Sequence, residues 1–381
     1  MKKILMGTTA IIALATFSSQ AAAAEKISLG LGGFQKAFAA KVSRAETNSQ
    51  TMKAAAWTDT EVHVKGSTTL DNGVTISTRI EFEADGSAGH HGHSLATADG
   101  ATTAKTAFGN SSATDESSMT ISSDAMGALT IGATTGAADK MHVGAPAIGP
   151  IGWGDVAGLD SNSTSSPMAT PRFGLKANEV GDFGDKSVKA VYMSPDFNGV
   201  TVGMSYTPGE GFGGQSSGKA VGHMASNDGF QASLGYSGEM SGAAVDVSLS
   251  HFNNNAAGIN TNAIGVNVGM SGITVGGSYH DFSDKGTITA AGDSKDGNGY
   301  DLGVAYESGA MSVAATYMKS ENKGVGTTAG KNKDTYWNLG VGYDLGAGVG
   351  LVAQYYSAKA TAEGATGNSS KGVVAGIEVS F

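Results

Sequence analysis

VVAGIEVSF, residues 373–381, carries the pattern that decides the fold. Apolar side chains stand at every second position, and small or polar residues such as Glu378 and Ser380 stand between them. Successive side chains of a β-strand point to opposite faces, so this alternation predicts a strand with one continuous apolar face. That face comprises Val373, Ala375, Ile377, Val379 and Phe381.

The same period of two recurs upstream, for example at residues 74–82, 200–206, 300–306 and 335–343. Sixteen strands are predicted in this way. They lie near residues 26–40, 58–69, 73–84, 116–124, 128–135, 186–193, 199–207, 228–237, 243–252, 262–270, 272–281, 298–306, 310–319, 334–343, 348–358 and 371–381. An even number of antiparallel strands lets the first pair with the last, which closes the sheet and leaves no edge.

The connections between these strands alternate between tight and long. The tight ones, such as LDNG at 70–73 and SPDFNG at 194–199, are rich in the Gly, Asn, Asp and Pro that hairpin turns need. The long ones are polar and lie near 41–57, 85–115, 136–185, 208–227, 253–261, 282–297, 320–333 and 359–370. This asymmetry is typical of a transmembrane barrel and has no reason in a soluble sandwich. The predicted fold class is all-β, an antiparallel up-and-down β-barrel of about sixteen strands with short periplasmic turns and long external loops.

The composition agrees with a barrel and excludes several other classes. The chain has 381 residues, of which 58 are Gly. A long helical domain is excluded, because each interior Gly costs a helix roughly 0.5–1 kcal/mol relative to Ala. Hydrophobic residues make up 40%, which is too many for a disordered chain, and the mean hydropathy of -0.09 fits strands with one apolar face. The chain has no Cys, so a disulfide framework and a thiol enzyme are both excluded.

The N-terminus predicts export. Lys2 and Lys3 precede an apolar run at residues 4–17, and small residues end at Ala24 before Glu25. This is the pattern of a secretory signal peptide, so we expect residues 1–24 to be removed and residues 25–381 to form the barrel. Loss of Lys2 and Lys3 takes the net charge from -10 to -12. A polyanion is a poor nucleic-acid binder, and we expect no nucleic-acid partner.

Aromatic residues at the predicted strand ends suggest two membrane-interface girdles. The predicted periplasmic set is Tyr192, Tyr236, Tyr306, Tyr343 and Phe381. The predicted external set is Tyr206, Tyr279, Tyr317, Tyr336, Trp337 and Tyr355. The alternative is the ordinary preference of Tyr for strands.

Three segments resemble the Gram-negative porin family, most closely the porins of alphaproteobacteria. They are EKISLGLGGFQ at 25–35, the hairpin KSVKAVYMSPDFNGVTVGMSY at 186–206, and the last strand ending in Phe381. In the hairpin, Tyr192 stands shortly before Ser-Pro-Asp-Phe-Asn-Gly, which is similar to the porin pattern of an aromatic residue before Ser-Pro-x-Phe-x-Gly. The resemblance implies a sixteen-stranded homotrimeric channel in the outer membrane of a Gram-negative bacterium. Outer-membrane lipid, lipopolysaccharide and the barrel assembly machinery are the implied partners, with Phe381 as the assembly signal.

The resemblance also implies a constriction, in which the third external loop folds into the lumen and its acids face basic residues on the wall. That loop is 136–185, and its candidate acids are Asp155 and Asp160. Inward parity predicts the basic wall positions, which are Lys36, Lys65, Arg79 and Lys189. The alternative for each residue is an ordinary solvated charge of the lumen or rim. The chain has few Arg residues, whereas the wall cluster of the family is rich in them.

Other motifs fail as functional sites. GGQSSGKA at 213–220 matches the spacing of a phosphate-binding loop but has Ala220 where Ser or Thr should bind magnesium. His90, His91 and His93 could bind a transition metal, yet no fourth ligand stands near them in the sequence. No spacing orders a nucleophile, a base and an orienting group, so we expect no enzyme and no cofactor or metal, apart from weak external calcium at the acidic loops.

The leading hypothesis is a porin that lets small hydrophilic solutes and ions diffuse passively, with a weak preference for cations. Small polar residues on the lumen face leave room for water, and the net negative charge enriches cations. The alternatives are an exported surface adhesin and an outer-membrane barrel protein that is not a channel. A solenoid adhesin should repeat at a fixed period, and the sequence has no such repeat.

Overall fold

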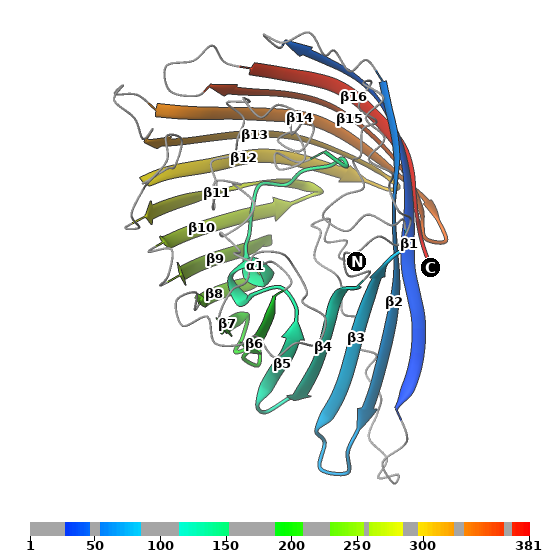
Figure 1. The fold of residues 1–381 in the computed structure, drawn as a ribbon, viewed down its shortest axis with the longest axis vertical. Helices are drawn as coiled ribbons and strands as arrows, with labels where there is room; N and C mark the ends of the chain where they lie inside the picture. The colour runs from blue at the N-terminus through cyan, green and yellow to red at the C-terminus, as the bar shows by residue number, and fades with distance from the viewer. Residues whose placement is uncertain are drawn as a thin grey trace, which may run out of the picture.

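In the computed structural model, sixteen antiparallel strands form a closed barrel, and neighbours in the chain are neighbours in the sheet (Figure 1). The structure describes residues 27–45, 54–84, 114–151, 187–208, 229–254, 259–284, 296–323, 331–361 and 368–381. The predicted fold class is confirmed. The strands are β1 Ser28–Ala45, β2 Ala54–Thr69, β3 Thr75–Glu83, β4 Thr114–Ser123, β5 Gly127–Ala133, β6 Val188–Met193, β7 Val200–Thr207, β8 Gly229–Met240, β9 Ala243–Asn254, β10 Ile259–Met270, β11 Ile273–Asp284, β12 Asp296–Ser308, β13 Met311–Lys323, β14 Lys331–Gly346, β15 Val349–Thr361 and β16 Asn368–Ser380.

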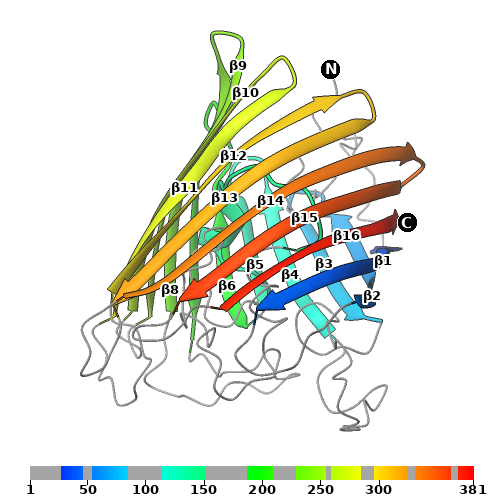
Figure 2. The same cartoon turned by 90° about the horizontal axis from the view of Figure 1, so that it is seen from above.

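The barrel is closed by pairing between β1 and β16, which lie side by side in both ribbon views (Figures 1 and 2). The C-terminal residue extends this seam, because Gly33 N–H donates to the Phe381 carbonyl at 2.9 Å and Phe381 N–H donates to the Gly33 carbonyl at 3.1 Å. Gly33 has a φ of 154°, and a Cβ on it would overlap the Glu61 carbonyl oxygen of β2. Every strand therefore has two partners, and the sheet has no free edge.

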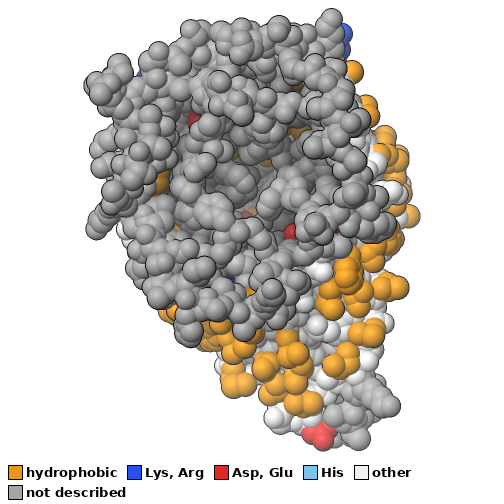
Figure 3. Space-filling model, viewed as in Figure 1, with side chains coloured by type: hydrophobic (Ala, Val, Ile, Leu, Met, Phe, Trp, Pro, Cys, Tyr) orange, Lys and Arg blue, Asp and Glu red, His pale blue; other side chains and the backbone are white. Residues whose placement is uncertain are grey.

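The two faces of the sheet differ as the period-two pattern predicts. On β16, Val374 is fully buried inside the barrel, whereas Val373 points outward and is 53% exposed. Outward positions along the other strands include many large apolar residues, and hydrophobic side chains gather on the described part of the outer surface in Figure 3, among small and polar groups. Buried inward positions include many Ser, Thr, Gln and Asn residues, together with Phe, Val, Tyr and Ala. The outer face thus suits lipid, and the inner face suits water.

Tight hairpins join the strands at one end of the barrel. In the β6–β7 hairpin, Asn198 and Gly199 both have positive φ, at 56° and 91°, and the Asp196 carboxylate accepts a hydrogen bond of 2.8 Å from Gly199 N–H. Positive φ at both central residues gives the backbone twist that matches a hairpin, and Asn and Gly tolerate it best. The turn residues chosen from the sequence are confirmed in this role.

Apart from the strand ends, two details differ from the sequence predictions. A short helix, α1 Ala137–Met141, follows β5 and was not predicted. Tyr336 was predicted in the external aromatic girdle, and this is wrong, because the residue faces the interior and is buried. The period of two already placed Tyr336 on the face opposite Trp337, and that parity holds. No helix in the described part of the chain is long and apolar enough to cross a membrane.

Candidate functional site

The candidate site is the interior of the barrel, which residues 134–151 cross after leaving the end of β5 (Figure 1). We call these residues the docked segment. Near its start it contains α1, whose N-terminal N–H groups have no partner within the helix. Wall side chains supply the partners, because Ala137 N–H donates to Ser205 Oγ of β7 at 3.1 Å and Ala138 N–H donates to Gln231 Oε1 of β8 at 2.8 Å.

Beyond α1 the docked segment is extended and continues along the wall. Val143 N–H donates to Ser248 Oγ of β9 at 2.9 Å, and Ala145 N–H donates to Asp301 Oδ1 of β12 at 2.9 Å. Its carbonyl groups are also bound: Asn267 Nδ2 of β10 donates to Gly144 O at 3.1 Å, and Thr316 Oγ1 of β13 donates to Pro146 O at 2.7 Å. Wall side chains thus take the place that a neighbouring strand would have.

The docked segment ends its described course at Ile151, which is buried. Ile151 N–H donates to Gln354 Oε1 of β15 at 2.9 Å, and its carbonyl accepts from Gln354 Nε2 at 2.7 Å and from the Tyr336 hydroxyl. The side chain belongs to the same buried cluster as Phe38 and Tyr356. Residues 134–151 therefore line the inner wall from the end of β5 to β15.

Inward glycines make the close approach of the docked segment possible. A Cβ on Gly303 would lie 2.7 Å from the Pro146 carbonyl oxygen, and a Cβ on Gly235 would lie 2.9 Å from Met141 Cε. At Gly265 and Gly340 it would overlap the carbonyl oxygens of Val143 and Ile148. Part of the high glycine content thus serves packing between the wall and this segment.

The wall formed by β1–β4 is different, because it carries charged side chains on its inward face. Lys36 Nζ of β1 lies 3.0 Å from Asp59 Oδ2 of β2 and 4.0 Å from the centre of the Phe34 ring. Lys65 of β2 lies directly opposite Arg79 of β3 in the strand register. Period-two parity had placed these three bases on the lumen face but had not shown that Lys65 and Arg79 are neighbours.

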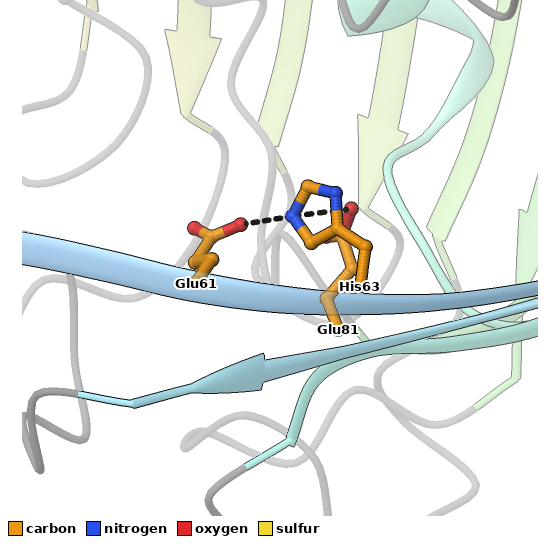
Figure 4. A group of neighbouring side chains, drawn as sticks. All are labelled: Glu61, His63 and Glu81. Atoms are coloured by element: carbon orange, nitrogen blue, oxygen red, sulfur yellow. Dashed lines mark hydrogen bonds and ion pairs between the residues drawn. The ribbon is translucent and has the colours of Figure 1, made fainter. Parts of the chain in front are cut away.

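A carboxylate and imidazole cluster lies next to these bases (Figure 4). His63 Nε2 lies 2.8 Å from Glu61 Oε2 and 3.5 Å from Glu81 Oε1. The Arg79 guanidinium donates two hydrogen bonds to Glu81 Oε1, and its Nε lies 3.9 Å from Glu116 Oε2 of β4. The wall is therefore mixed in charge. Each of these ion pairs and hydrogen bonds joins a carboxylate to Arg79 or to His63.

The sequence prediction named the wall bases and missed the acids beside them. The missed residues are Asp59, Glu61, Glu81, Glu83 and Glu116. The signal was available, since Glu81 and Glu83 share the parity of Arg79, and Asp59 and Glu61 share the parity of Lys65.

The fourth predicted wall base, Lys189 of β6, does not face open lumen. It is 1% exposed, and its Nζ donates to the Thr134 carbonyl at 2.7 Å, so it binds the start of the docked segment. The candidate acids Asp155 and Asp160 lie outside the described residues. The same is true of His90, His91 and His93, the segment 213–220 and the predicted signal peptide 1–24.

Two groups of wall residues have distances that a metal ion could use. The ligand atoms of Glu61, His63 and Glu81 lie within 4.8 Å of one another, and so do those of Asp59, Glu61 and Glu83. However, Arg79 already balances Glu81, and Lys36 already balances Asp59. One acid in each group therefore already has a cationic partner.

Comparisons with known proteins point to one family. A model described as Gram-negative porin matches residues 8–363. No curated protein sequence matches the chain. OmpT of Vibrio cholerae, in its in-vitro folded form, is 10% identical, with 96% of this chain and 99% of that chain covered and a TM-score of 0.60.

Two further solved structures are similar over the same extent. The anion-selective porin from Comamonas acidovorans is 16% identical, with 93% of this chain and 100% of that chain covered and a TM-score of 0.59. A mutant of the Rh. blastica porin is 15% identical, with 93% and 100% covered and a TM-score of 0.58. At these identities the structural likeness shows a shared fold.

Proposed function

The chain belongs to the Gram-negative porin family, and from that premise we propose that its lumen passes small hydrophilic solutes and ions by passive diffusion, with a weak preference for cations. The protein is an outer-membrane β-barrel that forms a channel. The observation that carries the proposal is the division of the lumen wall. The docked segment covers the inner faces from β6 to β15 largely with neutral groups, and charged side chains gather on β1–β4.

The preference for cations rests on the sign of the charges. Among the inward residues of β1–β4 the acids Asp59, Glu61, Glu81, Glu83 and Glu116 outnumber the bases Lys36, Lys65 and Arg79. Charges that line a narrow channel act on every passing ion. The Comamonas acidovorans porin shares the fold and is anion-selective, so the wall charges and not the fold set the sign.

Reversal potentials in planar lipid bilayers test this proposal. The mature protein should form discrete conducting channels, and in a KCl gradient the reversal potential should show potassium passing more readily than chloride. Raising the salt concentration should weaken the preference, because mobile ions screen the wall charges over roughly 10 Å at 0.1 M salt and 3 Å at 1 M. If no channels form, the proposal that the protein conducts is wrong. If chloride passes more readily than potassium, only the proposed preference for cations is wrong.

We also propose that the channel has no catalytic activity. The porin family and fold are known as non-enzymatic channels. The buried Asp301 and His280 of the wall lie beside Ser278, but Asp301 is engaged by backbone N–H groups of Ala145 and Ser278. Incubation with generic ester and peptide substrates should therefore show no turnover above a boiled sample.

A homotrimer is the proposed assembly. OmpT of Vibrio cholerae has been solved in a trimer form, with 11% identity and a TM-score of 0.58. The strands β5, β6 and β7 have 7, 6 and 8 residues. At about 3.3 Å per residue and a tilt near 45°, they span roughly 14–19 Å of the membrane normal, which is less than the apolar band of about 25 Å. Further copies at this short wall would relieve the mismatch, and sedimentation in detergent should show three chains per particle.

The roles implied by the family remain proposals for this chain. We propose that residues 136–185 form the constriction, with Asp155 and Asp160 facing the lumen and Lys36, Lys65 and Arg79 on the opposite wall. Phe381 is the proposed signal for the barrel assembly machinery, and outer-membrane lipid and lipopolysaccharide are the proposed surroundings. The docking of residues 134–151 inside the barrel supports the constriction, because it brings the chain into the lumen immediately before the two acids.

A further inference from the structure

The charged residues of the lumen wall differ in the partners that they contact. Asp301 and Lys189, on the wall beneath the docked segment, are each 1% exposed and bind that segment directly. On the opposite wall, Asp59 has Lys36 at 3.0 Å and Glu81 has the Arg79 guanidinium. Each of these charges has a permanently charged partner or lies buried under protein, so its field in the lumen is reduced.

Glu61 differs in the nature of its partner. Its carboxylate lies 2.8 Å from His63 Nε2, and its side chain is 17% exposed. Among the described residues no Lys or Arg is paired with this carboxylate, whereas Asp59 and Glu81 each have such a partner. The carboxylate of Glu61 is thus held in place by a hydrogen bond to an imidazole and not by a Lys or Arg side chain.

The position of Glu61 makes it the centre of the acidic part of the wall. It is the member that both groups of converging acids share, one with His63 and Glu81 and the other with Asp59 and Glu83. In the register it lies opposite Phe34 of β1 and Glu83 of β3. Asp59 stands two residues before Glu61 on β2, and His63 stands two residues after it. Two residues of a strand span about 6.7 Å, which is less than the screening length at physiological salt.

We infer that Glu61 is the residue that determines the charge preference of the channel, and that the favoured solutes are small hydrophilic cations, including metal ions and organic ammonium ions, which pass along the β2–β3 wall opposite the docked segment. The inference rests on the proposed function and adds the residue, the path and the class of solute. The wall contributes a fixed negative charge at Glu61, and cations exchange part of their water for it as they pass.

The first experiment is the substitution Glu61→Gln, measured by reversal potential in a KCl gradient at pH 8. A unit negative charge about 6 Å from a passing ion in water raises the local potassium concentration and lowers the local chloride concentration by about threefold each, so the ratio of potassium to chloride permeability should fall by up to about tenfold. Glu61→Asp keeps the charge and should keep the ratio. Asp71→Asn is the matched control, since it removes the same charge at an exposed tight turn and should change the ratio by less than about 1.5-fold.

A second variant covers the case in which Glu61→Gln does not fold. The chain has no Cys, so Glu61→Cys offers a unique thiol in the assembled channel. Its thiolate attacks a methanethiosulfonate reagent, a disulfide forms and a sulfinate leaves. An anionic reagent should restore the cation preference, and a cationic reagent of similar size should reverse it.

The outcomes separate the inference from the proposed function. If the native protein forms no channels, the proposed function fails. If channels form, but Glu61→Gln and Asp71→Asn shift the permeability ratio equally, or the two thiol reagents act alike, Glu61 does not determine selectivity and the inference is overturned.

Discussion

The carboxylate of Asp301 on β12 accepts a hydrogen bond of 2.9 Å from the backbone N–H of Ala145, although 156 residues separate the two in sequence. The same carboxylate accepts bonds from Ser278 N–H at 2.6 Å and from Ser278 Oγ at 2.9 Å. One buried acid therefore joins two neighbouring strands of the wall to the docked segment, and the width of the lumen depends on such contacts.

Replacing this acid should loosen the docked segment. Asp301→Ala leaves the buried N–H groups of Ala145 and Ser278 without their acceptor, and loss of a hydrogen bond to a charged group costs roughly 1.5–3 kcal/mol. We expect a wider spread of single-channel conductances and unfolding at a lower temperature, read from the gel mobility of heated samples. Glu239→Ala, at an exposed strand end, is the control and should behave as the native protein does. Unchanged conductance in Asp301→Ala would show that the other anchors suffice.

Adding a methyl group beneath the docked segment should narrow the channel. In Gly303→Ala the new Cβ would lie 2.7 Å from the Pro146 carbonyl oxygen, so the segment must shift away from the wall and into the lumen. Single-channel conductance should fall, with a stability loss of about 1–3 kcal/mol from overpacking. Gly350→Ala is the matched control, because its Cβ would have only the Tyr343 carbonyl oxygen nearby, at 3.9 Å. If both variants have equal conductance, Gly303 is not needed for the close approach of the docked segment to the wall.

Removal of the last residue should impair barrel closure. Phe381 forms two backbone hydrogen bonds with Gly33 at the seam between β1 and β16, and its ring faces outward. Deleting Phe381 should lower the amount of barrel in the outer membrane and leave unfolded precursor in the periplasm, as measured by fractionation. Ile377→Val, on the same outward face, keeps the seam and should assemble normally. Normal yield from the shortened chain would rule out the proposed signal.

Neutralising the proposed constriction acids should change selectivity more than neutralising acids elsewhere. The double change Asp155→Asn with Asp160→Asn should alter the permeability ratio more than Asp71→Asn with Asp124→Asn at two exposed tight turns, because charges in a throat act on every ion and exposed turn charges are screened. Planar-bilayer recording of both double variants decides the matter. If the two pairs have equal effects, residues 155 and 160 do not line a constriction.

The strands were predictable because their signal is local. A half-buried strand shows its faces in neighbouring residues, so 371–381 was placed within a few residues of β16. The ends of the strands were predicted less accurately. For example, β14 begins at Lys331 and not near residue 334, because polar residues continue the hydrogen-bonded ladder beyond the apolar part of the strand. Even the closure between the first and last strands followed from counting.

The contacts across the lumen were not predictable, because they join residues far apart in sequence. Nothing near Gln354 or Tyr336 in the sequence indicates that both bind Ile151. The same limit applies to Lys189, whose parity is right but whose ammonium is bound by the Thr134 carbonyl. Parity gives the face of a wall residue, whereas its neighbour across the lumen depends on the path of the loop.

The position of the docked segment in the sequence determines when its contacts with the wall form during folding. Residues 134–151 are synthesised before the strands that hold them, and their last anchor, Gln354, lies on the penultimate strand. Contacts of such long sequence separation form late, because the chain must first lose the entropy of closing a very large loop. The end of the docked segment is therefore fixed only when the wall is nearly complete, because Ile151 has no Gln354 to bind until β15 has joined the sheet.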